Sequence, residues 1–224
     1  MKSKLTISSM ISEAKNFCST ESSFDNNELY GITDGKAVGT FVEHKFQHTL
    51  SEKYEIVIGS SAKGIDFPSP EINADIKITS IRQPQSFCPF KSAEQKIFGL
   101  GYNLLLFVYD KIDNIQTKTA CLNFVNCSFI EQHRTADYQT TKSLLQLLAN
   151  NANREEIVAY LIERNLPADE ILLTQLADKI LLQPPQQGYL TISNALQWRL
   201  QYGRVVDLKG QVNGITRIVG NDQK

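Results

Sequence analysis

The sequence lacks the cysteine and histidine patterns that hold zinc. It contains four cysteines and three histidines in 224 residues, and no two cysteines form a Cys-x-x-Cys pair. Because zinc sites are built from closely spaced Cys and His ligands, a zinc-binding protein is not expected. The cysteines are expected to be reduced, as in a cytosolic protein.

Long apolar runs are also missing. No stretch approaches the roughly 18 consecutive apolar residues of a membrane span, so no membrane contact is expected. Residues 1–18 carry three lysines, but Ser8, Ser9 and Glu13 interrupt any apolar core of a secretory signal. These absences predict a cytoplasmic protein.

Net charge is nearly absent. Lys and Arg number 23 against 24 Asp and Glu, a formal charge of -1. Any contact with nucleic acid must therefore come from local basic patches. The length allows one large domain, or one domain with a smaller appendage.

The segment 64–79 brings acidic residues and a lysine together. Asp66 ends a short apolar segment, and Asp75 and Lys77 lie on a β-rich one. Two prolines and an asparagine make residues 68–73 the loop of a predicted hairpin, which places Asp66 close to Asp75. Because side chains alternate along a strand, Asp75 and Lys77 share one face.

Two interpretations of this cluster stay open on the residues alone. Asp75 and Lys77 can form an ordinary ion pair on an edge strand. Alternatively, the carboxylates form a divalent metal site beside a lysine, which suits phosphodiester hydrolysis. Glu43 lies beside the apolar stripe of a helix predicted from residue 34 to 50, and Gly39 one turn earlier would let another element approach it.

The remaining patterns predict a mixed α/β core in residues 1–133 and a mainly helical lobe in residues 134–224. The core combines a helix at 5–17, a meander of three strands, a helix from Ser92 to Tyr102 and two further strands. Its predicted strands span residues 54–58, 64–67, 74–81, 104–109 and 119–130. The lobe has predicted helices at 141–150, 154–164, 168–182 and 193–202.

The lobe is predicted to end in two strands, 204–208 and 214–219, around a Gly and Asn turn. Helices followed by a hairpin are typical of a winged-helix DNA-binding module, although the lobe could instead serve dimerisation. Its end carries an excess of positive charge, which suits phosphate contact. The basic residues are Arg199, Arg204, Lys209 and Arg217.

The order of these features resembles the PD-(D/E)xK nuclease superfamily, most closely a type II restriction endonuclease. The features are a glutamate on a helix, a strand, Asp66, and then Asp75, Ile76 and Lys77 on the next strand. The resemblance covers residues 34–110, and Ile65 stands where the family has proline. It implies a restriction-endonuclease-like mixed sheet flanked by helices.

The resemblance further implies that Asp66, Asp75 and the carbonyl of Ile76 hold Mg²⁺. Glu43 would complete the outer coordination or serve a second metal ion, and Lys77 would orient and help deprotonate the attacking water. The implied activity is Mg²⁺-dependent, site-specific hydrolysis of double-stranded DNA in restriction-modification, by a homodimer.

The polar loop after the motif offers Arg and Gln side chains that match guanine and adenine edges. With the basic residues of the lobe, these are the predicted DNA contacts: Arg82, Gln83, Gln85 and Lys91. Three alternatives stay open. They are a DNA repair or recombination nuclease of the same superfamily, a noncatalytic winged-helix DNA-binding regulator, and a scaffold with ordinary surface charge.

Overall fold

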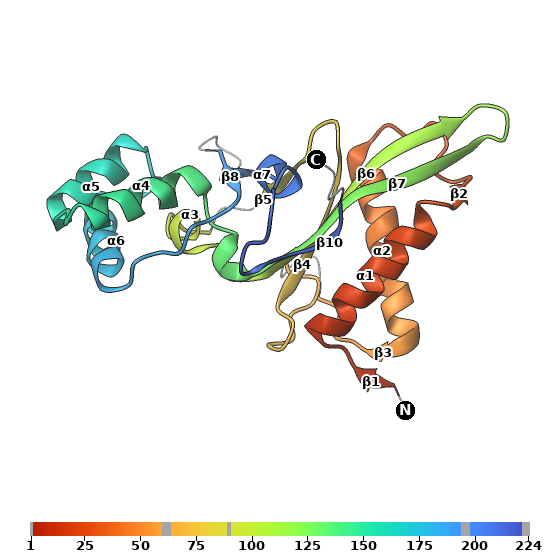
Figure 1. The fold of residues 1–224 in the computed structure, drawn as a ribbon, viewed down its shortest axis with the longest axis horizontal. Coiled ribbons are helices and arrows are strands. Elements are labelled where there is room, and N and C mark those ends of the chain that lie inside the picture. The colour runs from red at the N-terminus through yellow and green to blue at the C-terminus, as the bar shows by residue number, and fades with distance from the viewer. Residues whose placement is uncertain (1, 60–63, 89–90, 194–197, 221–224) are drawn as a thin grey trace. The chain divides into compact units, whose positions relative to one another are not determined.

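The computed structural model describes residues 2–59, 64–88, 91–193 and 198–220 (Figure 1). The chain forms two compact units built from interleaved segments. The first, the sheet unit, contains Met1–Gln85, Tyr102–Ile130 and Lys209–Lys224. The second, the helical unit, contains Ser86–Gly101 and Glu131–Leu208. In the described part of the chain, no helix is long and apolar enough to cross a membrane.

The sheet unit is organised around a mixed sheet with the strand order β10-β7-β6-β4. β4 runs parallel to β6, whereas β6 and β7, and β7 and β10, are antiparallel. The buried strand predicted at 104–109 lies in the first half of β6, as its continuous apolar run indicates. The sheet strands are β2 (Asp25–Asn26), which pairs with β7, β4 (Ala74–Ser80), β6 (Asn103–Asn114), β7 (Thr119–Ile130) and β10 (Ile215–Val219).

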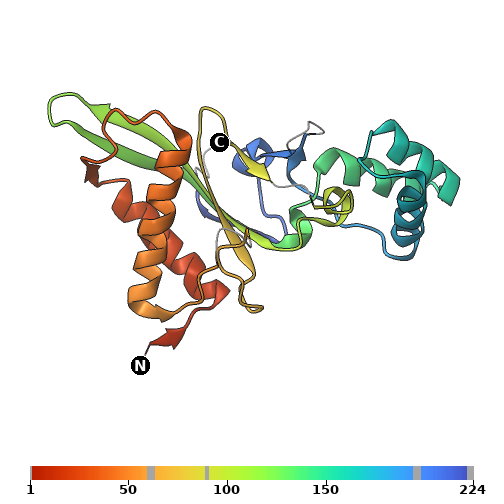
Figure 2. The ribbon, with the colours of Figure 1, turned by 180° about the vertical axis from the view of Figure 1, so that it is seen from behind.

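Two helices cover one face of this sheet, as Figures 1 and 2 show. α1 (Ile7–Glu21) begins at a Thr6 capping box, and α2 (Gly35–Lys53) is capped by the Asp34 side chain. Both helices bury apolar side chains in one core with β4, β6 and β7. Four rings meet there at edge-on or tilted angles, with centroids 5.2 to 6.0 Å apart. They are Phe17, Phe46, Phe107 and Phe124.

The predicted meander of three strands is wrong. β3 is only Tyr54–Glu55, and it runs parallel to β1 (Ser3–Lys4). The segment 64–67 contributes a single bridge, Phe67 to Ala74. Gly64 stands at φ +65° on one side of it and Pro68 on the other, so too little extended backbone remains to make a strand.

The helical unit has its own apolar core and confirms three of the predicted helices. Their N-caps are the side chains of Asp137, Asn153 and Asp169. The helices are α3 (Gln95–Phe98), α4 (Tyr138–Ala149), α5 (Arg154–Glu163), α6 (Glu170–Leu182) and α7 (Gly203–Val206), with a 3₁₀ turn, η1 (Gln132–Arg134). A small sheet has the order β5-β9-β8, with β5 (Gln85–Cys88), β8 (Thr191–Ile192) and β9 (Trp198–Gln201).

The helix predicted from Ser92 to Tyr102 shortens to α3, and the expected capping box is absent, since Glu94 is the N-cap and makes no side-chain cap bond. Gly99 and Gly101, at φ +93° and +87°, end the helix because they adopt the left-handed region. The helix predicted at 193–202 is also wrong where the structure describes it, because residues 198–201 form a strand. Residues 194–197 lie outside the described residues.

The predicted winged-helix hairpin is not formed. Residues 203–206 are helical, and β10 pairs with β7 instead of with a neighbouring strand of the lobe. Pairing with the long β7 gives β10 a ladder inside a larger sheet, whereas an isolated two-stranded hairpin is marginally stable. The final strand of the chain thus completes the sheet unit.

Candidate active site

A tight turn builds the acidic end of the site. Phe67 and Ala74 exchange two backbone hydrogen bonds, of 2.9 and 3.1 Å. Between them Asn73 stands at φ 40°, which Asn tolerates better than other side chains. Asp66 and Asp75 flank this bridge, so the turn brings the two carboxyl groups together as the sequence predicts.

The two carboxyl groups are hydrogen-bonded to each other, and the backbone N–H of Ile76 donates to Asp66 Oδ2 at 2.7 Å. Asp75 is 4% exposed. Burial, and then the bond to Asp75 and its negative charge, raise the pKa of Asp66 to about 8, whereas the Ile76 N–H acts in the opposite direction. Without a cation, Asp66 therefore keeps its proton at neutral pH.

Lys77 completes the cluster on the same face of β4. Its Nζ lies 2.6 Å from Asp75 Oδ2, and its side chain is 20% exposed. β4 lies at one edge of the sheet, so among the described strands none covers the outer side of this cluster. The arrangement combines two acids and an ammonium within hydrogen-bond reach.

Glu43 reaches the cluster from α2. A Cβ on Gly39 would lie 4.0 Å from Ile78 Cβ, so β4 packs close to α2 one turn before Glu43. Burial is the main cause that raises the pKa of Glu43, while the charge of His44 lowers it. The charge of Asp75 raises the pKa of Glu43 and the charge of Lys77 lowers it, both by smaller effects. Glu43 therefore interacts electrostatically with the cluster.

Sequence reasoning missed Gln47, which lies one helical turn after Glu43. Gln47 is buried, and its Nε2 donates to Glu43 Oε1 at 3.4 Å. The spacing of four residues on a helix is the signal that could have found it, because such residues are neighbours on one helix face.

The donors present fit a hard divalent cation. Two carboxylates held together in a buried position repel each other when ionised, and a divalent cation between them would remove that repulsion. Among the described residues, no three side chains of His, Cys, Asp and Glu converge as metal ligands. Mg²⁺ is commonly held by one or two carboxylates together with waters and substrate phosphate, which two carboxylates and a carbonyl suit.

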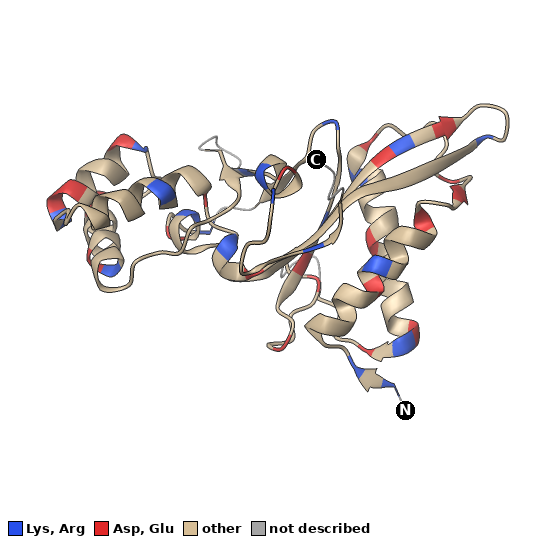
Figure 3. Ribbon diagram, viewed as in Figure 1, with Lys and Arg blue, Asp and Glu red and all other residues tan. Residues whose placement is uncertain are grey.

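The predicted DNA contacts fall on both units. Figure 3 shows Lys and Arg interspersed with Asp and Glu along each unit. Arg204 places its guanidinium 4.0 Å from the ring centre of Tyr138. Arg82, Gln83, Gln85, Lys209 and Arg217 belong to the sheet unit, and Lys91, Arg199 and Arg204 to the helical unit.

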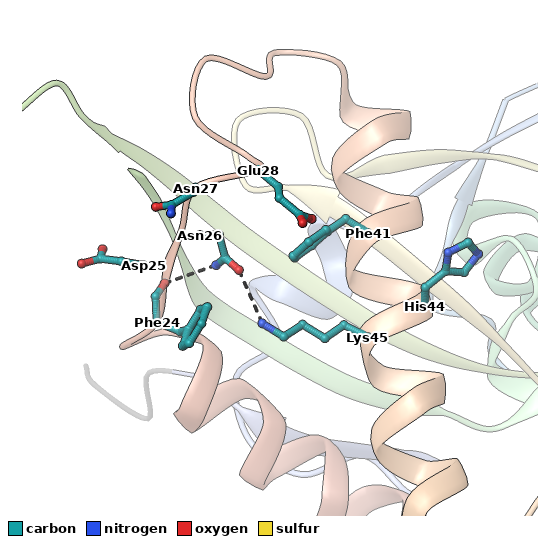
Figure 4. Close-up of a pocket in the computed structure, with 8 residues that line it drawn as sticks. All are labelled: Phe24, Asp25, Asn26, Asn27, Glu28, Phe41, His44 and Lys45. Atoms are coloured by element: carbon teal, nitrogen blue, oxygen red, sulfur yellow. Dashed lines mark hydrogen bonds between the residues drawn. The ribbon is translucent and has the colours of Figure 1, made fainter. Parts of the chain in front are cut away.

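A pocket of about 600 Å³ lies elsewhere in the sheet unit, between the segment 24–28 and α2 (Figure 4). Lys45 spans it, with Nζ 2.8 Å from Glu21 Oε2 and 4.2 Å from the centre of the Phe24 ring. The Lys45 ammonium also donates a hydrogen bond to Asn26 Oδ1 at 3.4 Å. These contacts tie the segment 24–28 to α2 and leave the pocket separate from the carboxyl pair.

Comparison with known proteins decides between the alternatives. The sequence model of one family, described as Type II restriction enzyme NspV, matches residues 4–217. The chain belongs to the NspV family of type II restriction enzymes. The Type II restriction enzyme NspV of Nostoc sp. (strain ATCC 29411 / PCC 7524) is 55% identical over 218 residues, which cover 97% of this chain and 98% of that protein.

No solved structure matches the chain. Membership of the NspV family confirms the predicted class of enzyme, a type II restriction endonuclease. The family match gives no support to a noncatalytic regulator or to a repair nuclease.

Proposed function

We propose that this NspV family member hydrolyses phosphodiester bonds at a specific site in double-stranded DNA, with Mg²⁺ as cofactor, in restriction-modification. A restriction enzyme family implies a divalent metal ion and a DNA substrate. The contact of Asp66 with Asp75 beside Lys77 carries the proposal. This contact brings together two carboxyl groups that could hold a metal ion and a lysine that could meet the substrate or the water, which supports the proposal.

In this proposal Asp66, Asp75 and the main-chain carbonyl of Ile76 hold Mg²⁺, and Glu43 completes the outer coordination or serves a second ion. When bound, the ion would lower the pKa of a coordinated water and neutralise charge on the phosphate. Asp66, which keeps its proton in the metal-free protein, would release that proton to solvent in order to hold the ion as a carboxylate.

Lys77 would orient the attacking water as an ammonium and would help to deprotonate it as the neutral amine, which has the lone pair that accepts the proton. Its Nζ is held 2.6 Å from Asp75 Oδ2, which fixes the ammonium at the edge of the carboxyl pair. A positioned acid-base group of this kind contributes about 10²- to 10⁴-fold to a reaction. Gln47 keeps Glu43 facing the cluster through its amide.

The arrangement of α2, the turn before β4 and β4 itself supports a PD-(D/E)xK active site on a restriction-endonuclease-like sheet. We also propose that the segment after β4 and the basic side chains of both units contact DNA. Alanine at any of the basic positions should lower affinity and reduce the salt dependence of binding. Unchanged binding would remove that position from the interface.

A palindromic site requires a two-fold dimer, so we propose that the enzyme acts as a homodimer in the cytoplasm, where its DNA substrate lies. The helical unit, with the rest of residues 134–224, is proposed to serve DNA binding or dimerisation. Sedimentation equilibrium of the protein with cleavage-site DNA should give the mass of the duplex plus two chains, and the mass of the duplex plus one chain would contradict the dimer.

A digest tests the proposed function. Purified protein is incubated with unmethylated phage DNA, with Mg²⁺ or with chelator, and the products are separated on a gel. Discrete fragments that require Mg²⁺ are expected, and sequencing their ends would give the recognition site. A smear would instead indicate a nonspecific nuclease, and intact DNA would contradict the proposal.

A further inference from the structure

Thr79 is the third polar side chain on the catalytic face of β4. Side chains two residues apart share a face of a strand, so Thr79 follows Asp75 and Lys77 on theirs. It is 6% exposed and precedes the last residue of the strand. The segment 81–85, which we propose to contact DNA, begins directly after β4.

The Thr79 hydroxyl contacts both arms of the turn that this segment makes. Oγ1 lies 3.0 Å from the Gln83 carbonyl oxygen and 3.1 Å from the Gln85 carbonyl oxygen. The Gln85 N–H is shared between Oγ1, at 3.1 Å, and the Gln83 carbonyl oxygen, at 2.8 Å. A hydroxyl has one proton, so it donates to one of these carbonyls at a time and accepts from the Gln85 N–H. The buried Thr79 hydroxyl therefore binds backbone groups of Gln83 and Gln85, which lie beyond the end of β4.

The rest of the turn is held by backbone bonds. Ile81 N–H donates to the Tyr109 carbonyl at 2.8 Å and continues the pairing with β6. Gln83 N–H donates to the Ser80 carbonyl at 3.2 Å. These bonds leave the side chains of Arg82 and Gln83 exposed, while Thr79 below them is buried.

We infer that Thr79 is a positioning residue for site specificity. Its hydroxyl holds the segment 81–85 at a fixed offset from Lys77 on the same strand face, so that Arg82 and Gln83 meet the bases when the phosphate meets Lys77. The inference rests on the proposed function. Supporting contacts of this kind decide specificity because small misplacements of recognition groups are costly.

Three variants test the role. Thr79→Val removes the hydroxyl and keeps the β-branched shape, and Thr79→Ser keeps the hydroxyl. Thr119→Val is the matched control, because Thr119 is 7% exposed on β7 and its hydroxyl bonds the Thr117 hydroxyl at 2.6 Å. The substrates are duplexes that contain the wild-type cleavage site, taken from sequenced fragment ends, and duplexes altered at one base pair.

Thr79→Val should lower the ratio of kcat/KM between the correct and the altered duplex by about 10-fold, the effect of one lost hydrogen-bond network. Thr79→Ser and Thr119→Val should keep the ratio within about 3-fold of wild type. The Gln85 amide should exchange hydrogen faster in Thr79→Val alone. If Thr79→Val does not fold, Thr79→Ala takes its place with the same expectations.

An unchanged ratio in a folded Thr79→Val, or an equal loss in Thr119→Val, would overturn the inference. Failure of wild type to cut any duplex would be a failure of the proposed function instead. Hydrogen exchange separates the two cases, because it measures the contact of Thr79 with the segment 81–85 without any cleavage. Unchanged exchange at Gln85 would overturn the inference even then.

Discussion

Asp66 carries a proton that the fold forces it to keep. Burial, together with the bond to Asp75 and its charge, raises the pKa of Asp66 to about 8, whereas an Asp in an unfolded chain titrates near 3.9. Between these values the folded protein binds one more proton at this position than the unfolded chain. The free energy of unfolding of the metal-free protein therefore falls as pH rises through this window.

Asp66→Asn should remove that pH dependence. The amide has the same shape and its oxygen can still accept from the Ile76 N–H, but it has no charge to lose. In chelator, the variant should gain on the order of 2 kcal/mol in unfolding free energy over wild type between about pH 5 and about pH 8. Urea unfolding at both pH values measures this gain.

Mg²⁺ supplies the complementary measurement. The ion should raise the melting temperature of wild type at about pH 8 and leave Asp66→Asn nearly unchanged, because ligand binding stabilises only a protein that binds it. If the unfolding free energies of wild type and Asp66→Asn in chelator changed equally with pH, the raised pKa of Asp66 would have no part in the folding equilibrium.

The residues of the cluster could be predicted from the sequence because they depend on local rules. Prolines and Asn73 mark the turn, and alternation along a strand places Asp75 beside Lys77. The amide of Gln47 depends on where α2 lies against β4, and the hydroxyl of Thr79 on the path of the chain after the strand. Both contacts require the packed structure.

At the scale of elements, Gly59 controls the path of the chain into the site. Its N–H donates to the Asp66 carbonyl at 2.8 Å, and a Cβ at this position would lie 1.9 Å from the Ile65 carbonyl oxygen. Backbone cannot approach a side chain so closely, so any other residue must push the segment before β4 away. The close approach, rather than an unusual φ, requires glycine here.

Gly59→Ala should therefore lower the unfolding free energy by about 1 to 3 kcal/mol, the usual effect of overpacking. It should also lower the cleavage rate, because the displaced segment carries Asp66. Gly35→Ala is the control, since nothing lies within 4 Å of a Cβ there, at the first residue of α2. Thermal unfolding and a timed digest compare the two, and equal stability would contradict the crowding at Gly59.

Several strands with a clear local pattern agree with their predicted bounds, whereas the pairing between distant segments could not be predicted. β7 has the predicted bounds, and β6 contains the predicted apolar run. Each strand is long enough for its residue pattern to distinguish a strand from a helix. β10, at Ile215–Val219, nearly matches the predicted strand 214–219, but its partner β7 lies far away in the sequence, as does β1, the partner of β3. Residues 204–208 are predicted as a strand, but residues 203–206 form a helical turn, α7, which buries Val205.

At the scale of the whole molecule, segments far apart in sequence form each unit. The chain leaves the sheet unit after Gln85, returns at Tyr102, leaves again after Ile130 and comes back at Lys209. The pattern of residues along the chain predicts where helices and strands lie, but it does not show which distant strand pairs with an edge of a sheet. The family match covers residues 4–217, and thus segments of both units.

The proposed catalytic centre is the carboxyl pair of Asp66 and Asp75, so Asp75 and Lys77 on β4 should be more than a surface ion pair. A second Lys–Asp pair in this chain provides a comparison for Asp75 and Lys77. Lys111 and Asp113, two residues apart on β6, also form an ion pair, with Asp113 35% exposed. Asp113→Asn is therefore the control for Asp75→Asn.

Single-turnover cleavage of a duplex that contains the site, in Mg²⁺, tests the claim most directly. Asp75→Asn should cut slower than wild type by about 100-fold or more, and should still bind the duplex in chelator as wild type does. Asp113→Asn should cut at the wild-type rate. Cleavage by Asp75→Asn at the wild-type rate would place the catalytic centre elsewhere.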